Sequence, residues 1–214
     1  METLIPPPQI LVPLLLRTDR LASLPSLHLV RAGDGAPPRL RTSVRVGWRE
    51  GALLVRFDGR DDGRVATKTR RDDALWEEDV FEVFVSPQDP PHLYYEFEVN
   101  PLGTLFDAAI VSPRLSRPTL CVDVLWDCPG YRASVRRTEK RWSALLTIPL
   151  APLSEGPTPS VWRANFFRVD RGAGRAPDEY SAWSPANRQP PDFHDATRFG
   201  TLRLVGLEAS GPRS

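Results

Sequence analysis

Prolines and glycines interrupt this chain so often that they leave no room for a long helix. The 214 residues include 23 prolines and 14 glycines, and no long segment holds apolar residues at a helical spacing. Between the interruptions lie many short runs in which apolar and polar residues alternate, the pattern of half-buried strands. We therefore expect an all-β chain, a distorted β-sandwich or jelly roll of about ten or more strands in a single domain.

The domain limits follow from where these runs begin and end. Strand-like runs occupy residues 42–207, which we assign to the sandwich. Residues 1–41 form an N-terminal segment expected to pack on the sandwich or to enter it, and residues 208–214 form a tail expected to be disordered. Segments 17–41 and 171–193 are rich in Gly, Pro, Asp and Arg and are predicted to be long loops, which in compact domains are often functional.

The clearest strand pair lies in residues 72–107. In residues 80–85, VFEVFV, Glu82 lies on one face while Phe81, Val83 and Val85 share the other. Residues 94–100, YYEFEVN, alternate in the same way. The break at 86–92, SPQDPPH, contains three prolines and is predicted to be the hairpin turn, because proline cannot continue a ladder. The second strand has an apolar face for a core and a face lined with hydrogen-bonding groups.

Further strands are predicted along the rest of the chain. Residues 42–48 and 52–58 are separated by Arg49-Glu50-Gly51, which predicts a three-residue hairpin turn with the glycine in the left-handed region. The other expected strands are residues 65–69, 103–111, 120–126, 131–137, 141–148, 161–170 and 201–207. Residues 149–156 are predicted to contain a single helical turn.

The balance of charge bounds the partners of the chain. Lysine and arginine total 28 against 27 for aspartate and glutamate, a net charge of +1. We therefore expect neither a nucleic-acid partner nor a membrane surface. The early apolar run ILVPLLL has no basic leader and contains a proline, so a cytoplasmic location is expected. Cys121 and Cys128 would lie roughly 23 Å apart in an extended strand, too far for a disulfide, and are expected to be free thiols.

A series of motifs resembles a known family. In chain order these motifs are LWEEDVFEVFVSP, YYEFEVNPLG, RWSALLTIPL, WRANFFRVDR, YSAWSP and PDFHDATRFGTLRL. Together they resemble carbohydrate-binding module family 9, which has a DOMON-like β-sandwich, over residues 40–207. The resemblance implies a distorted β-sandwich that holds a sugar terminus between two aromatic rings. It also implies structural calcium in some members.

Carried over residue by residue, the resemblance implies a binding site. Trp76 and Trp183 are similar to the two rings of an aromatic clamp, Glu82 to the strand carboxylate, and Asn100 to the amide on the neighbouring strand. The C–H patches of a pyranose ring stack on aromatic faces, and carboxylates accept hydrogen bonds from its hydroxyls. The expected function is non-catalytic binding of a saccharide or similar polyol.

Two further side chains are candidates for contacts with the ligand. Glu98 follows Glu96 on the polar face of its strand, and both add carboxylates where sugar-binding members of the family present basic or neutral donors. Arg168 either pairs with an acid such as Glu82 or donates to ligand hydroxyls. The other four tryptophans, Trp48, Trp126, Trp142 and Trp162, alternate with apolar neighbours and are expected in or beside the core.

Two other functions remain open. A carbohydrate-active hydrolase would use Glu82 with Glu96 or Glu98, because glycoside hydrolysis needs paired carboxyl groups. A fold relative without a sugar site would serve as a protein-interaction domain. Parallel rings of Trp76 and Trp183, a sugar's thickness apart, would favour binding, whereas burial of the rings in separate clusters would favour an interaction role. Deep enclosure of two carboxylates would favour the enzyme.

The crowded acids before residue 80 are candidates for a metal site. Asp72, Asp73 and Asp79 belong to a run of five carboxylates within eight residues, and Ca²⁺ is the ion that such oxygen ligands bind. The spacing matches no fixed calcium motif, and a salt-bridged loop is the alternative. His194, flanked by Asp192 and Asp195, is expected to secure a loop against the last strand.

Overall fold

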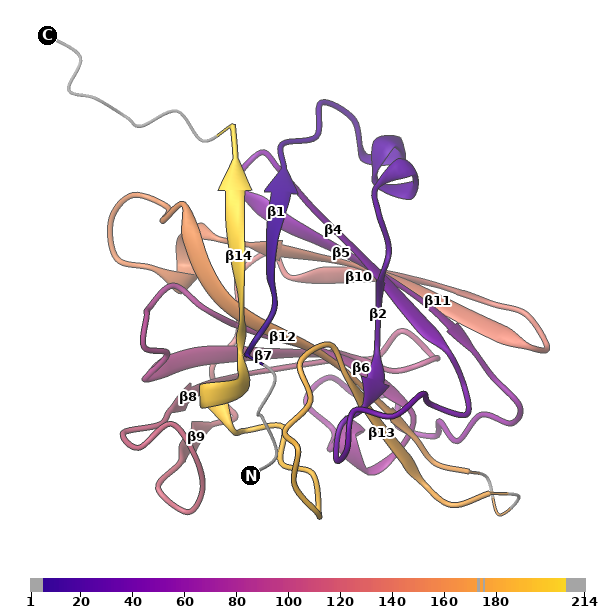
Figure 1. The fold of residues 1–214 in the computed structure, drawn as a ribbon. Coiled ribbons are helices and arrows are strands. Elements are labelled where there is room, and N and C mark those ends of the chain that lie inside the picture. Colours follow the sequence, from indigo (N-terminus) through magenta and orange to yellow (C-terminus); the bar gives the residue numbers. More distant parts are fainter. Residues whose placement is uncertain (1–5, 173, 175, 207–214) are drawn as a thin grey trace, which may run out of the picture.

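The computed structural model describes residues 6–172, 174 and 176–206 of the chain. Its described part has 14 strands in two sheets and four short 3-10 turns (Figure 1). The predictions of an all-β chain and of a β-sandwich are confirmed. The expected disordered tail, residues 208–214, lies outside the described residues. Within the described part, no helix is long and apolar enough to cross a membrane.

The larger sheet has nine strands and carries the predicted strand pair at its centre. Its main path is β1 (Gln9–Pro13), β14 (Gly200–Val205), β12 (Val161–Asp170), β6 (Val80–Ser86), β7 (Leu93–Val99), β8 (Leu105–Val111) and β9 (Cys121–Asp123). β13 (Glu179–Ala182) pairs with β12 and with the short strand β3 (Val30–Arg31). β6 and β7 are antiparallel, and their connection at residues 87–92 is the predicted proline-rich turn.

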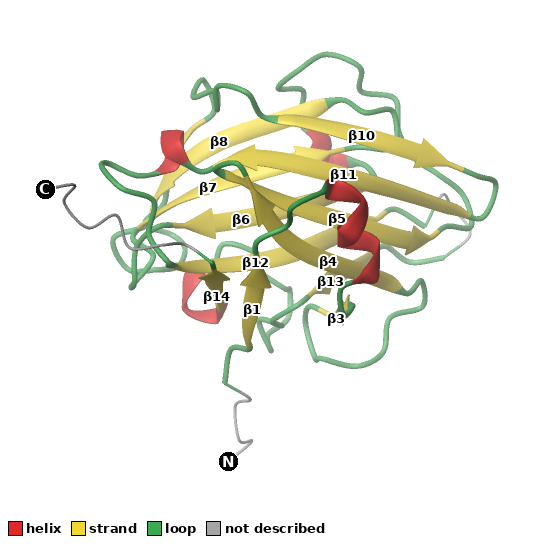
Figure 2. Ribbon diagram, turned by 90° about the horizontal axis from the view of Figure 1, so that it is seen from above, coloured by secondary structure: helices red, strands yellow, loops and turns green. Residues whose placement is uncertain are grey.

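The smaller sheet packs over one face of the larger sheet (Figure 2). Its five strands are β10 (Arg132–Arg137), β11 (Arg141–Pro149), β5 (Ala52–Arg60), β4 (Thr42–Arg49) and β2 (Leu27–His28). The 3-10 turns are η1 (Thr18–Ser23), η2 (Leu75–Glu77), η3 (Ala151–Leu153) and η4 (Ala196–Arg198). The N-terminal segment contributes to both sheets, since β1 runs parallel to β14 and β2 pairs with β4.

The main core lies between the sheets. The ring of Phe81 from β6 stacks between Phe57 of β5 at 4.7 Å and Trp142 of β11 at 3.6 Å between centroids. Trp48, Trp142 and Trp162 are buried here, and Trp126 packs against the same cluster partly buried, as expected. Stacked aromatic rings contribute roughly 0.5–1.5 kcal/mol beyond the burial of their area, so this column fixes the two sheets against each other.

A second apolar layer covers the outer face of the larger sheet. Phe84 and Phe167 from the sheet pack there with Leu75, Ala196 and Phe199 from the connecting segments. The larger sheet is therefore buried on both faces. This explains why the face that the sequence marks as polar on β7 is not open to solvent, and why polar side chains on it become buried.

Two local predictions were wrong. The turn between β4 and β5 has two residues, because Arg49 pairs with Ala52 within the ladder. Glu50 and Gly51 both have positive φ, 50° and 74°, as the tightest hairpin turns require. Residues 65–69 form no strand, since the backbone N–H groups of Thr67 and Lys68 donate to the carboxylate of Glu78 instead of to a neighbouring strand.

Candidate functional site

Three glutamates meet on the outer face of β6 and β7. Glu82 is paired directly with Glu98 across the two strands, and Glu96 precedes Glu98 by two residues on the same face. Their side chains are buried, with Glu82 2%, Glu96 6% and Glu98 0% exposed. One carboxylate oxygen from each lies within 4.8 Å of the others. We call these residues the glutamate triad.

The triad is electrostatically costly when ionised. Burial raises the pKa of Glu96 to about 7, although a hydrogen bond with Glu98 and the charge of Arg117 oppose the rise. Burial and the neighbouring carboxylates raise the pKa values of Glu82 and Glu98 well above their usual range. Neither oxygen of Glu98 receives a hydrogen bond from a donor among the described residues. Burial and mutual repulsion therefore favour the protonated forms of these carboxyl groups.

Neutralising one member should make stability less dependent on pH. A raised carboxyl pKa means that the folded chain binds more protons than the unfolded chain between pH 4.5 and about 7, so stability falls as the pH rises through that window. At about 1.4 kcal/mol per pKa unit, Glu96→Gln should gain up to roughly 3 kcal/mol over wild type at pH 8 and nothing at pH 4. Urea unfolding at both pH values measures this, and an equal effect at the two values would contradict it.

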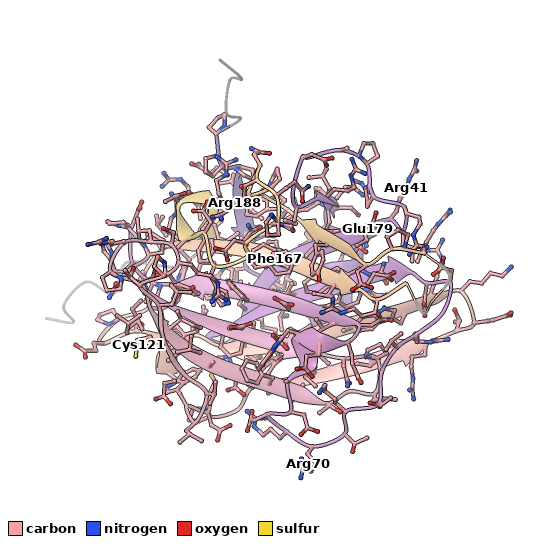
Figure 3. All side chains as sticks on the ribbon, turned by 90° about the horizontal axis from the view of Figure 1, so that it is seen from below. Arg41, Arg70, Cys121, Phe167, Glu179 and Arg188 are labelled. Carbon is pink, nitrogen blue, oxygen red and sulfur yellow. The ribbon has the colours of Figure 1, made fainter. Side chains whose placement is uncertain are left out.

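Two members of the triad, Glu82 and Glu96, lie at the floor of a cavity of about 610 Å³, and the fully buried Glu98 lies behind them. Sheet residues form the floor: Glu82, Phe84, Glu96, Phe106 and Val169. The walls come from connecting segments and β13 and include Trp76, Arg171, Tyr180, Asp192, Phe193 and His194. Figure 3 views the molecule from below, with Phe167 of the same face labelled and Arg188, which also lines the cavity, on the neighbouring loop. The cavity thus combines acidic groups at its floor with aromatic walls.

Trp76 is the exposed ring of this cavity. It lies on η2, is 41% exposed, and packs edge-on against Phe106 with 5.1 Å between ring centroids. Arg171 fixes its backbone, donating from Nη2 to the carbonyl of Trp76 at 2.5 Å and from Nε to that of Glu77 at 3.0 Å. The same guanidinium donates to Asp178 and to the hydroxyl of Tyr180, both at 2.7 Å. The ring is therefore held in place while part of its surface stays open.

His194 secures a loop, though not against the last strand. Its Nδ1 lies 2.8 Å from the hydroxyl of Tyr94 on β7, so the loop is tied to the centre of the larger sheet. Burial lowers the pKa of His194 to about 4, with Arg117 adding to the effect and Asp192 opposing it. The imidazole is neutral at physiological pH.

Trp183 does not meet Trp76. Trp183 follows β13, is 9% exposed and belongs to the core between the sheets. Its ring packs against Phe166 with 5.3 Å between centroids. Trp76 instead stands over the outer face, where Phe106 belongs to the second apolar layer. Because alternate residues of a strand point to opposite faces, the two rings lie on opposite sides of the larger sheet, and the expected clamp of these two indoles is not formed.

Arg168 also points away from the cavity. It pairs in register with Phe81, not with Glu82, and its side chain is 1% exposed on the inner face. Its Nη2 lies 2.5 Å from Asp170, and its Nη1 donates to the hydroxyl of Thr42 at 3.0 Å. The expected pair with Glu82 is therefore replaced by a pair with Asp170, two residues along the same strand.

Asn100 lies on the triad's strand face but serves a turn. Its Oδ1 accepts from the backbone N–H groups of Leu102 at 3.0 Å and Thr104 at 2.9 Å, and its Nδ2 donates to the carbonyl of Lys68 at 2.8 Å. The side chain is fully buried. These bonds close the β7–β8 turn and dock the extended segment beside it, which leaves little capacity for a ligand.

The predicted calcium ligands do not converge. Asp79 accepts from the backbone N–H groups of Val65 and Arg171, and Asp73 accepts from the backbone and guanidinium of Arg70. Asp72 lies near Asp107 and Asp127. Arg71 fills the space between those acids, with ion pairs to all three. Asp72, Asp73 and Asp79 therefore do not fit a shared calcium ion, and the salt-bridged loop describes them better.

Comparison with known proteins identifies the family. The model of carbohydrate-binding family 9 matches residues 12–204. An extracellular protein of Arthroderma benhamiae is 26% identical over 180 residues, which cover 78% of this chain and 80% of that protein. The chain belongs to carbohydrate-binding family 9.

Solved structures share the fold. A proposed carbohydrate-binding protein of Bacteroides uniformis has a TM-score of 0.75 at 19% identity, covering 92% of this chain and 99% of that one. A family 9 module of Caldicellulosiruptor kristjanssonii in complex with cellotriose has a TM-score of 0.67 at 12% identity, covering 96% and 99% of the two chains. The same organism's module with glucose has a TM-score of 0.63 at 12% identity, covering 96% and 100%. At these identities the likeness concerns the fold.

Several wall residues were missed as single candidates. Arg171, Tyr180, Arg188 and Phe193 were not assigned to a site, and Asp192 was named only as a neighbour of His194. All five lie in the long segment 171–193 that the sequence marks by its Gly, Pro, Asp and Arg content. That signal locates the segment, but which of its side chains turn inward depends on how it crosses the sheet.

Proposed function

We propose that this protein binds a saccharide in the cavity over the outer face of the larger sheet. Trp76 offers a partly exposed ring for the C–H face of a pyranose. Glu82 and Glu96 offer carboxyl groups to its hydroxyls from the cavity floor. Family membership supports the proposal, as do two structural neighbours that are complexes with cellotriose and glucose.

The observation that carries the proposal is the composition of the cavity. Ligand sites combine a mainly apolar lining with a few convergent polar groups, and here aromatic walls surround two carboxyl groups in about 610 Å³. The volume suits one or two sugar rings, since pockets for small ligands measure roughly 300–1,000 Å³. Tyr180 and Phe193 also line the cavity and supply aromatic surface that Trp183 does not.

Replacing Trp76 should remove most of the affinity without unfolding the protein. We expect Trp76→Ala to weaken saccharide binding by up to roughly tenfold, because ring stacking contributes about 0.5–1.5 kcal/mol beyond the burial of its area. Isothermal titration with cellotriose and glucose, after a glycan array, measures the effect. Leu102→Ala is the matched control, since Leu102 is also 41% exposed but does not line the cavity. Unchanged affinity in Trp76→Ala would place the sugar elsewhere.

The same floor favours a second candidate, glycoside hydrolysis. Such enzymes pair one protonated with one ionised carboxyl group, about 5–5.5 Å apart in retaining enzymes, and the triad oxygens lie within 4.8 Å with the pKa of Glu96 raised to about 7. Incubation with cellotriose and release of reducing sugar would test this. Turnover that Glu96→Gln abolishes would establish hydrolysis, whereas intact ligand recovered from a saturable complex supports binding alone.

A further inference from the structure

Within the described residues the glutamate triad has no ion-paired partner, although the more distant charges of Arg171 and Arg117 lower the pKa values of Glu82 and Glu96 in part. The arginines that line the same cavity are engaged with other acids: Arg171 with Asp178 at 2.7 Å, and Arg117 and Arg188 with Asp192 at 3.4 Å and 3.9 Å. Among the described residues, no ion pair joins a basic side chain to Glu82, Glu96 or Glu98. Glu98 is fully buried, and both its oxygens lack a donor. Uncompensated buried acids cost stability, so the arrangement suits a cation supplied from outside.

The geometry of the triad matches an ammonium group. A primary ammonium has three N–H donors and no acceptor, and the triad presents one oxygen from each of three carboxyl groups within 4.8 Å of one another. A calcium ion requires six to eight oxygen ligands. The other floor residues, Phe84, Phe106 and Val169, supply no side-chain oxygens.

An aromatic surface stands directly beside the triad. Phe106 is paired in register with Glu98, and Trp76 packs edge-on against Phe106 at 5.1 Å. A sugar ring stacked on Trp76 would therefore lie close to the carboxyl groups, with Phe106 between Trp76 and Glu98. A ligand that spans both must carry a positive group close to a ring with C–H faces.

We propose that the cavity selects a saccharide with a free amino group, such as a glucosamine unit, whose ammonium is held by Glu82 and Glu96 at the floor, with the carboxyl group of Glu98 behind them, while its ring stacks on Trp76. This inference rests on the proposed saccharide binding and names its ligand class. Binding also releases protons, because the ammonium charge lowers the raised pKa values of the triad.

Three trisaccharides that differ at one substituent test the inference. Cellotriose carries a hydroxyl at carbon 2, the glucosamine trimer an ammonium and the N-acetylglucosamine trimer a neutral amide. Titration calorimetry at pH 6.5 should give roughly 10- to 100-fold tighter binding of the glucosamine trimer than of the other two, the range expected for charge-assisted hydrogen bonds. Buffers of different ionisation enthalpy should reveal proton release with that ligand alone.

Variants of the triad assign the preference to these residues. In Glu98→Gln, and independently in Glu96→Gln, the affinity ratio of the glucosamine trimer to cellotriose should fall towards one, while Leu102→Ala keeps it. Equal wild-type affinity for the glucosamine trimer and cellotriose would overturn the inference and leave saccharide binding intact. Failure of all three to bind would remove both proposals. Titration with CaCl₂ alone that shows tight binding, lost in Glu98→Gln, would assign the triad to a metal and overturn the inference as well.

Discussion

Replacing Trp183 with alanine is expected to lower the free energy of unfolding by about 3–5 kcal/mol, the range for removing a large aromatic side chain from a packed core. The ring is 9% exposed, lies in the core between the sheets and packs against Phe166. It also fills the space over Gly200, where even a Cβ atom would lie 2.4 Å from the indole. The cavity left behind cannot close without moving β14 against β12.

Urea unfolding of Trp183→Ala, compared with that of Trp76→Ala, measures the change in the free energy of unfolding. Trp76 has the same side chain but is 41% exposed, so its removal should cost less than about 2 kcal/mol while weakening saccharide binding. Trp183→Ala should show the reverse, with binding retained at temperatures where the protein is folded. A stable Trp183→Ala variant that no longer binds saccharide would restore Trp183 to the site and contradict the placement of its ring.

The fold could be predicted from the sequence because the alternation of apolar and polar residues indicates which residues share one face of a strand. Phe81, Val83 and Val85 face the main core as their alternation indicates, and Glu82 faces the other way. Residues 65–69 were assigned wrongly, because an extended segment held by the side chain of Glu78 has the same composition as a strand. Local pattern reports backbone extension, but it does not report which partner accepts the hydrogen bonds.

The site was harder to predict from the sequence, since it depends on which face of the sheet is covered by a loop. Trp76 and Glu82 could be named from the acidic run and the lone acid in β6, and both line the cavity. Trp183 was assigned to the same surface from its position in a loop, and Arg168 from its charge, which could pair with Glu82 or donate to a ligand. Register decides otherwise: Arg168 pairs with Phe81, and Phe166 contacts Trp183 on the inner face. Which residues of two distant strands point to the same face of the sheet depends on how the strands pair in the folded protein, and a single sequence does not show this pairing.

Replacing Arg168 with methionine is expected to cost about 3–5 kcal/mol, the range for breaking a buried ion pair by removing one partner. The guanidinium is 1% exposed, bonds Asp170 at 2.5 Å and lies over the ring of Phe81 at 5.9 Å. Its loss leaves the buried carboxylate of Asp170 with Arg39, at 2.8 Å, as its remaining partner. Desolvation already raises the pKa of Asp170 against the charge of Arg168. Loss of Arg168 raises this pKa further, so the variant should lose more stability than wild type as the pH rises from the usual carboxyl range through the raised pKa.

Two further variants compare the buried Arg168–Asp170 ion pair with a more exposed ion pair. Arg45→Met breaks a half-exposed pair with Asp58 at 3.3 Å and should cost no more than about 1 kcal/mol. Arg168→Met combined with Asp170→Asn removes the stranded charge and should recover part of the loss in urea unfolding. Saccharide affinity should be unchanged in Arg168→Met wherever it is folded, because its side chain faces the core and not the cavity. A folded Arg168→Met variant with weakened binding would mean that the arginine reaches the ligand, and a cost below 1 kcal/mol would mean that the pair is solvated.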